Sequence, residues 1–212
     1  MVVDIGTGDG LFVYQSARRN PDTFYIGVDA NARPLEKVSE RIYRRPARGG
    51  VLNALFVQAP IGELPPELNG IAGEVRVHFP WGSLLKAVAK PEESSLQSLR
   101  RLCSPSARLV VIIGLDTVRD HAEMQRLGLA LISVEYIDST LTPGYKTCGF
   151  EVLEEACCHQ RNGPHSERPG QGDSEATATG QCSTSLPGQL RVRWRQGIRD
   201  ARSQVTCHAS RA

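Results

Sequence analysis

The sequence lacks any hydrophobic run long enough to cross a membrane, and it is poor in aromatic residues. Aromatic residues make up 6% of its 212 residues, and two of them are tryptophan. A transmembrane helix needs about 18 or more consecutive apolar residues, and no apolar run in this sequence reaches that length. The first residues also lack the charged and apolar regions of a secretory signal peptide. We therefore expect a cytoplasmic protein with no membrane partner.

The cysteines do not form a recognisable pattern either. Of the six cysteines, Cys103 and Cys148 stand alone in the body of the chain, and the other four follow residue 156. Their spacing matches no zinc-site template, so we expect reduced thiols and no metal site. The formal net charge of +2 is close to neutral, so the average charge neither favours nor excludes a nucleic-acid partner.

Apolar runs alternate with amphipathic stretches over the first 153 residues. FYIGVD, NALFVQA, EVRVHF and LVVIIGL are typical of buried strands, whereas DGLFVYQSARRN and RPLEKVSERIYRR have helical periodicity. Strands that alternate with helices indicate a mostly parallel sheet with helices on both faces. The sequence therefore predicts a Rossmann-like α/β domain over residues 1–153.

The character of the chain changes after residue 153. Residues 154–212 contain no lysine and only six residues among Val, Ile, Leu, Met, Phe, Trp and Tyr. Such a composition buries too little apolar surface to offset the entropy lost on ordering. We expect a disordered tail, and a frameshifted terminus is an alternative origin for the same composition.

A glycine-rich turn follows the first expected strand, in the stretch VVDIGTGDG. Gly6, Gly8 and Gly10 stand at alternate positions after Asp4, a spacing that differs from the G-x-G-x-x-G of dinucleotide sites and from a P-loop. Glycine allows unusual backbone angles and lets a ligand approach closely. The second strand ends in Asp29, where an acidic residue can accept hydrogen bonds from ribose hydroxyls. This pattern predicts a nucleoside-type cofactor.

These motifs, together with HFPWGSLL after the fourth strand, resemble the class I methyltransferases that give aminoglycoside resistance of the kanamycin–apramycin type. Members methylate adenine N1 in the decoding-site helix of 16S rRNA. The resemblance covers about residues 2 to 153 and implies S-adenosylmethionine as cofactor. It also implies that Trp81, flanked by Phe79 and Pro80, stacks on the flipped-out adenine. The cofactor-binding residues carried over from the family are Asp4, Gly6, Gly8, Asp29, Ala30 and Glu63.

The expected chemistry needs no general base. Adenine N1 carries a lone pair at neutral pH and can attack a sulfonium methyl group directly, so catalysis is mainly positioning. Extruding the base costs a few kcal/mol, and stacking returns about 1–3 kcal/mol per base. We therefore expect no catalytic triad, and we interpret His78 as a structural residue.

The second expected helix carries a basic face. Leu35, Val38 and Ile42 share one side, and between Arg33 and Arg48 there are six basic and two acidic residues. Such a face is either a solvated surface or a set of phosphate contacts. The resemblance favours docking on 16S rRNA in the 30S subunit, by a monomer. The residues that match the basic positions of the family are Arg41, Arg44, Arg45 and Arg48.

The sequence departs from the family at three places. The family has a β-hairpin before the first strand, which Met1 directly precedes here. Gly62 stands where an acid is expected near the cofactor's adenine, so either Glu63 replaces that acid or the contact is lost. No convincing final strand follows GFEVLE, and Trp194 is the candidate for the second base-stacking tryptophan. We therefore expect a sheet that is incomplete at both ends, and impaired activity.

Two other functions remain open from the residues alone. The glycine turn and NPDTFYIGVDAN also occur in tRNA guanine-N7 methyltransferases, although FPWGSLL argues against that family. A noncatalytic cofactor- or RNA-binding remnant is the other alternative. Cofactor binding without methyl transfer would distinguish the remnant from an enzyme.

Overall fold

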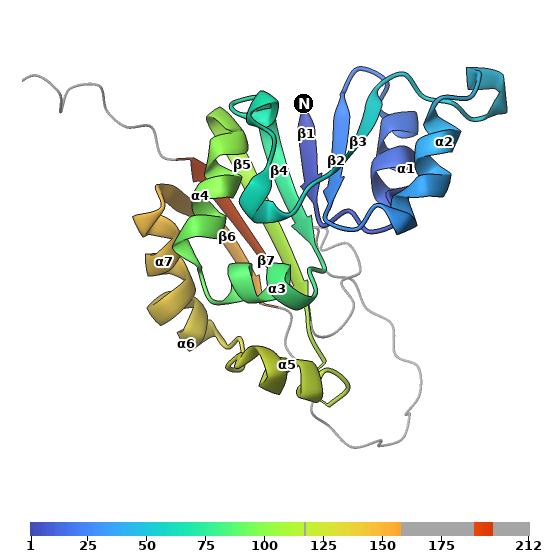
Figure 1. Ribbon diagram of the computed structural model, residues 1–212. Coiled ribbons are helices and arrows are strands. Elements are labelled where there is room, and N and C mark those ends of the chain that lie inside the picture. Colours follow the sequence, from blue (N-terminus) through green and yellow to red (C-terminus); the bar gives the residue numbers. More distant parts are fainter. Residues whose placement is uncertain (117, 158–188, 197–212) are drawn as a thin grey trace, which may run out of the picture.

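A computed structural model describes residues 1–116, 118–157 and 189–196 of the chain (Figure 1). The described residues form a seven-stranded sheet in the order β3-β2-β1-β4-β5-β7-β6. Strands β1 to β5 pair in parallel, and β7 is antiparallel to both β5 and β6. The strands are β1 (Val2–Ile5), β2 (Tyr25–Asp29), β3 (Ala54–Gln58), β4 (Ala72–His78), β5 (Cys103–Gly114), β6 (Phe150–Cys157) and β7 (Gln189–Gln196).

Helices cover both faces of this sheet, as the alternation of apolar patterns predicted. The α-helices are α1 (Leu11–Arg19), α2 (Glu36–Ile42), α3 (Gly82–Ala89), α4 (Glu93–Leu102), α5 (His121–Leu127), α6 (Val134–Tyr136) and α7 (Thr142–Thr147). Short 3-10 turns, which include Pro46–Arg48 and Ile61–Glu63, lie in the loops, and a π-turn, Ile137–Leu141, joins α6 to α7. No described helix has the length and apolar character that a membrane span requires.

Two hydrophobic clusters lie on opposite sides of the sheet because side chains alternate along each strand. Val2 of β1 packs in a cluster with Val13 of α1 and Val38 of α2. Its neighbour Val3 belongs to the larger cluster, which includes Leu85 of α3 and Leu99 of α4. Adjacent residues of β1 therefore contribute to the hydrophobic clusters on opposite faces of the sheet.

The expectation that no final strand follows β6 is wrong. QLRVRWRQ forms β7, which inserts between β5 and β6 and pairs with both along most of its length. Apolar and basic residues alternate from Leu190 to Arg195, which is the period of a strand. The average composition of residues 154–212 concealed that local pattern. The sheet is therefore not incomplete on its C-terminal side.

The expected boundary at residue 153 stays a prediction. Strand β6 continues past it to Cys157, so the last residues of β6 and all of β7 belong to the sheet. The disordered tail was predicted for a segment that, apart from these strand residues, lies outside the described residues.

The parallel order of β1 to β5 brings their carboxyl ends to one edge of the sheet, the lower edge in Figure 1. The glycine turn after β1, Asp29 at the end of β2 and FPWG after β4 all lie at this edge. In open α/β sheets, ligands bind outside the carboxyl ends of the strands. This edge is the place to look for the functional site.

Candidate functional site

The glycine turn at the end of β1 has the backbone that its sequence predicted. Gly6, Gly8 and Gly10 all have positive φ angles, at 74°, 61° and 69°. A Cβ on Gly6 would lie 2.4 Å from Cδ2 of Leu84 in α3, so this glycine lets α3 close over the turn. A Cβ on Gly8 would meet no atom within 4 Å. The backbone at Gly8 therefore faces open space, where a ligand can approach it.

Asp29 connects this turn to the end of β2. Its Oδ2 accepts a hydrogen bond from the Gly8 amide at 2.8 Å, and its Oδ1 accepts one from the Asn31 amide at 2.9 Å. A carboxylate has about four acceptor positions, so both oxygens can still accept hydrogen bonds from a ligand. The half-buried Asp29 side chain is thus held in one orientation before any ligand binds.

Asp4 is buried at the start of the same turn. Its Oδ1 and the hydroxyl of Thr7 have no hydrogen-bond partner within the part of the chain that the structure describes. Burial raises the pKa of Asp4 to about 6, and the nearby Thr7 hydroxyl and Arg76 guanidinium offset only part of this effect. Buried polar atoms without a partner are costly and usually have a functional reason. A ligand with a cationic donor would satisfy Asp4.

The FPWG segment presents two aromatic side chains at the end of β4. Trp81 is 56% exposed and Phe79 is 54% exposed, whereas Pro80 is buried. Phe79 has a φ of 49°, which is uncommon for a residue with a side chain, and its amide donates to the Ile112 carbonyl of β5 at 2.7 Å. Trp81 is the N-cap of α3, the helix that carries Leu84 onto the glycine turn. The tryptophan therefore stands next to the candidate cofactor site.

The loop after β3 lies beside Asp29. The Ala59 amide donates to the Asp29 carbonyl at 2.9 Å, and the Gln58 side chain donates to the carbonyl of the exposed Ala30 at 3.3 Å. Glu63 is exposed at the end of the turn Ile61–Glu63. A Cβ on Gly62 would meet nothing within 4 Å, so an acidic side chain would fit there.

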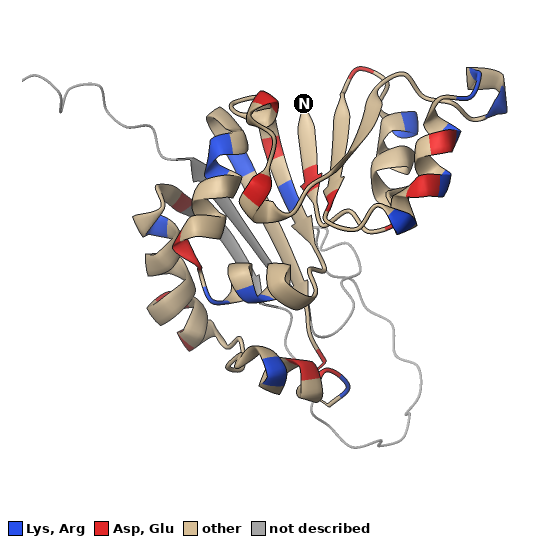
Figure 2. Ribbon diagram, in the orientation of Figure 1, with Lys and Arg blue, Asp and Glu red and all other residues tan. Residues whose placement is uncertain are grey.

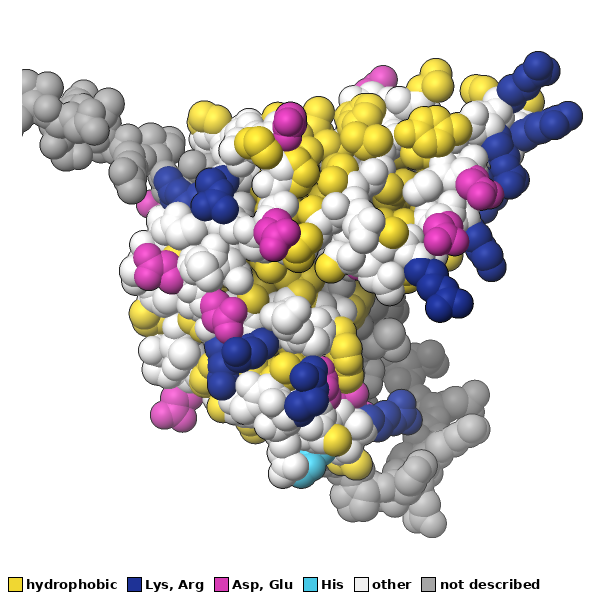
Figure 3. Space-filling view, viewed as in Figure 1, with side chains coloured by type: hydrophobic (Ala, Val, Ile, Leu, Met, Phe, Trp, Pro, Cys, Tyr) yellow, Lys and Arg dark blue, Asp and Glu magenta, His cyan; other side chains and the backbone are white. Residues whose placement is uncertain are grey.

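The basic residues lie away from this edge. Residues 43–52, which we call the basic tip, connect the end of α2 to the start of β3, and Asn53 pairs with Tyr25 at the start of β2. The basic tip is therefore at the amino ends of the strands, the upper right of Figure 1. The basic tip carries three arginines and no lysine, and basic residues gather at this corner of the molecule (Figures 2 and 3). The structure thus separates the two groups of predicted site residues.

Arg41 differs from the other three predicted RNA-binding arginines. Its guanidinium lies over the ring of the buried Tyr14, at 4.4 Å from the ring centroid. The Tyr14 hydroxyl in turn donates to the Gly49 carbonyl at 2.8 Å. Arg44, Arg45 and Arg48 are exposed. All four arginines are therefore exposed, but the Arg41 guanidinium also contacts the Tyr14 ring.

Trp194 cannot be the second base-stacking residue. In β7 it pairs with Leu109 of β5 and Val152 of β6. Strand β5 continues to Gly114, which pairs with Gln189, so Trp194 lies within the sheet and back from the carboxyl edge. We assigned Trp194 to base stacking because it was the remaining tryptophan. That assignment was wrong, because its segment forms strand β7.

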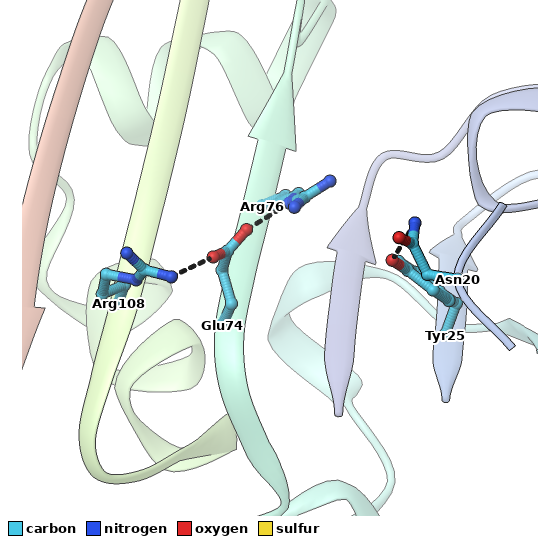
Figure 4. A network of polar contacts seen from close by, with 5 residues as sticks. All are labelled: Asn20, Tyr25, Glu74, Arg76 and Arg108. Carbon is cyan, nitrogen blue, oxygen red and sulfur yellow. Dashed lines mark hydrogen bonds and ion pairs between the residues drawn. The ribbon is translucent and has the colours of Figure 1, made fainter. Parts of the chain in front are cut away.

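Sequence reasoning did not anticipate a partly buried ion-pair network that joins β4 to β5 (Figure 4). Glu74 contacts Arg76 on its own strand and Arg108 on β5, the latter at 3.2 Å. The network lines a cleft of about 350 Å³ with Phe12 and His78, whose ring centroids are 4.8 Å apart. The alternation of charged and apolar residues in EVRVHF was the available signal. The network fixes β4, and hence FPWG, relative to β5.

Thr7 and Leu84 were also missed. Thr7 lies between two glycines of the turn, and its position there could have indicated a role. Leu84 gave no signal, because its contact with the turn depends on how α3 packs.

The strand order with an antiparallel β7 inserted before the edge strand, and the glycine turn after β1, define a Rossmann-like class I methyltransferase. The family model described as NpmA, 16S rRNA (adenine(1408)-N(1))-methyltransferase, matches residues 1–166. The chain belongs to this family.

Individual relatives agree with the family match. A 16S rRNA (adenine(1408)-N(1))-methyltransferase from Escherichia coli is 37% identical over 154 residues, which cover 71% of this chain and 69% of the relative. The crystal structure of the aminoglycoside resistance methyltransferase NpmB1 is similar with a TM-score of 0.74 and 38% identity, covering 92% of this chain and 86% of that chain. A mutant enzyme from Catenulisporales acidiphilia with cosubstrate SAM has a TM-score of 0.75 and 28% identity, covering 94% and 87%.

Proposed function

We propose that this chain transfers a methyl group from S-adenosylmethionine to N1 of adenine 1408 in 16S rRNA of the 30S subunit, and so gives aminoglycoside resistance. The family match supports the reaction. The observation that carries the proposal for this chain is the exposed Trp81 on α3, beside the glycine turn and Asp29. A class I cofactor site without such an aromatic platform would indicate a different substrate.

The residues present fit the cofactor. Asp29 has free acceptor positions for the two ribose hydroxyls, and Gly6 and Gly8 leave room for the methionine part beside the backbone. The unpartnered Oδ1 of Asp4 suits a cationic donor such as an ammonium group. Ala30 and Glu63 lie on the loops that flank Asp29, where the adenine would be bound. When bound, S-adenosylmethionine supplies an activated methyl group on a sulfonium.

The proposed chemistry requires positioning rather than proton removal. The lone pair of adenine N1 forms the new N–C bond as the S–C bond breaks, and the sulfur keeps the electron pair. Trp81 stacks on the extruded base and so offsets part of the extrusion cost of a few kcal/mol. The methylated base is cationic, and an indole face stabilises a cation. Phe79 and Pro80 hold the tryptophan at the strand end.

We further propose that the basic tip binds rRNA phosphates through Arg44, Arg45 and Arg48. Its exposed arginines support this role, because phosphate contacts fix position without reading sequence. We also expect the enzyme to act as a monomer without a metal ion.

The test is methyl transfer to purified 30S subunits, read as a primer-extension stop at adenine 1408. Trp81→Ala should reduce transfer by orders of magnitude while cofactor affinity measured by calorimetry stays unchanged. Trp81→Phe, which keeps an aromatic face, should retain much of the activity. Cofactor binding without a stop from the wild-type chain would identify a noncatalytic remnant. Methylation of tRNA guanine in its place would identify the other enzyme family.

A further inference from the structure

One tyrosine of the basic tip is exposed in a way that the cofactor site and the arginines do not explain. Tyr43 is 77% exposed, whereas Tyr14, Tyr25 and Tyr145 are buried and Tyr136 is half-buried. These five are all the tyrosines of the sequence. Tyr43 caps the C-terminus of α2, and Arg44 and Arg45 follow it directly. An aromatic ring thus projects to solvent at the base of the arginine cluster.

The backbone around Tyr43 is fixed. The Val51 amide donates to the Ile42 carbonyl at 3.0 Å and closes the base of the tip. The Gly50 amide donates to the Arg45 carbonyl at 3.2 Å, and a Cβ on Gly50 would lie 1.6 Å from the Arg44 carbonyl oxygen. The tip is therefore a tightly closed loop, and its exposed side chains lose little backbone entropy on binding.

A second apolar side chain accompanies the ring. Leu52 is 87% exposed and follows Val51, the residue that pairs with Ile42 next to Tyr43. Single exposed apolar residues are ordinary, but two at the neck of one rigid loop with three exposed arginines form a mixed surface. Arginines suit phosphates, and an aromatic face suits a nucleobase. Proteins bind unpaired RNA bases with this combination, whereas paired bases are hidden in the helix.

We propose that Tyr43 stacks on an unpaired base of the RNA while the arginines of the basic tip hold the phosphates around it. This inference rests on the proposed function, because it takes RNA as the partner. It adds a second recognition point at the opposite end of the strands from Trp81. The tip then selects RNA that displays an unpaired nucleotide near a duplex, and not duplex phosphates alone. Tyr43 is a positioning residue, since it lies in the basic tip, at the amino ends of the strands, and not at their carboxyl ends.

The test compares Tyr43→Ala with the matched variant Tyr43→Phe in the full chain. The probes are 30S subunits and two RNA hairpins, one with a single unpaired adenosine and one fully paired. Tyr43→Ala should weaken binding to 30S subunits and to the hairpin with the unpaired adenosine by roughly 5- to 160-fold, the range that stacking on one base gives. It should leave the slope of log K against log salt unchanged. Tyr43→Phe should bind like the wild type, and neither variant should lose affinity for the paired hairpin.

Each contrary outcome overturns the inference. Equal affinity of Tyr43→Ala and wild type shows that the ring makes no contact. If Tyr43→Phe loses as much affinity as Tyr43→Ala, the contact is made by the tyrosine hydroxyl and not by stacking of the ring. A loss on 30S subunits with none on either hairpin points to a ribosomal protein as the partner. If the wild-type protein methylates 30S subunits and any of these results is obtained, the proposed function still holds. If the wild-type protein binds neither the 30S subunits nor either hairpin, both the proposed function and this inference are refuted.

Discussion

We expect cofactor binding to depend most directly on the Asp29 side chain. It holds the Gly8 and Asn31 amides and has acceptor positions left for a ribose. Asp29→Ala should weaken S-adenosylmethionine binding by roughly 1–3 kcal/mol, because polar groups of turn and ligand are left unpaired. Isothermal calorimetry measures this loss. Asp22→Ala, which removes an exposed carboxylate before β2, serves as the control and should not change the affinity. Unaltered binding by Asp29→Ala would remove the ribose assignment.

Asp4 makes stability depend on pH. Burial raises its pKa from 3.8 to about 6, so the folded protein holds a proton that the unfolded chain releases at lower pH. The free protein should therefore lose stability as pH rises from about 4 through about 6, by about 3 kcal/mol for this group alone. In urea unfolding, the Asp4→Asn variant should not show this loss of unfolding free energy with pH. At pH 7 it should be more stable than the wild type. Parallel pH profiles of the two proteins would contradict the buried carboxyl.

The same residue links pH to the cofactor. If a cationic donor of S-adenosylmethionine pairs with Asp4, binding favours the ionised carboxylate. Wild-type affinity should then increase as pH rises through about 6, whereas that of Asp4→Asn should not. Calorimetry at pH 5 and pH 7 on both proteins separates this contribution from general effects of pH on the enzyme.

Individual site residues were predictable where the motif is contiguous or ends a strand. The glycine turn, Asp29 and Trp81 belong to this class, because backbone constraints and strand direction place them. Arg41 was grouped with the phosphate-binding arginines on helical periodicity and on the match to the basic positions of the family. Its contact with the Tyr14 ring joins two helices and depends on their packing. Periodicity shows which face of a helix is polar, but it does not show what that face touches.

At the scale of elements, the arginines of the basic tip should behave differently from Arg41. Replacing Arg44, Arg45 and Arg48 with alanine should weaken the salt dependence of 30S binding. On the scale measured for duplex DNA, the slope of log K against log salt concentration should decrease by up to about 0.9 for each lost phosphate contact. Arg41→Ala should leave that slope unchanged and destabilise the fold by roughly 0.5–1 kcal/mol, through loss of the cation–π contact. Filter binding over a salt series and thermal unfolding measure the two effects.

Strand β7 can be tested in the same way. Because it lies between β5 and β6, both edges of its backbone are paired. Val192→Pro removes a backbone donor from this central strand and should destabilise the protein, by about 1–3 kcal/mol for one unpaired backbone group. Val192→Ala, which keeps the backbone amide, is the matched control for loss of the donor. Equal thermal midpoints for Val192→Pro and wild type would exclude β7 from the sheet.

Strands β1 to β5 and helices α1 and α2 were predictable because each carries a regular apolar pattern, whereas α3 to α7 were not predicted. Strand β7 was not predicted because it is one short alternating segment in a polar stretch. Its pairing partners, β5 and β6, precede it by dozens of residues. Partners so distant in sequence leave no local signal. The position of Trp194 follows from that pairing, which is why the residue type alone led to the wrong role.

At the scale of the whole molecule, the structure separates the region that we propose binds the ribosome from the region that we propose transfers the methyl group. Trp81 lies at the carboxyl ends of the strands and the basic tip at their amino ends (Figure 1). Replacing Arg44, Arg45 and Arg48 with alanine should raise the 30S concentration needed for half-maximal transfer and leave the rate at saturation nearly unchanged. Trp81→Ala should lower the saturated rate itself. Steady-state kinetics on 30S subunits distinguish the two effects.

Because these two regions lie at opposite ends of the strands, their effects should add. For distant sites, the free-energy changes of a combined variant usually match the sum of the single changes within about 0.3–0.5 kcal/mol. We expect that result for kcat/KM when the three arginine substitutions are combined with Trp81→Ala. A combined loss much smaller than the sum would mean that docking of the tip and extrusion of the adenine are one concerted step. In that case the tip would help to open the RNA, and the rate at saturation should fall in the arginine variant as well.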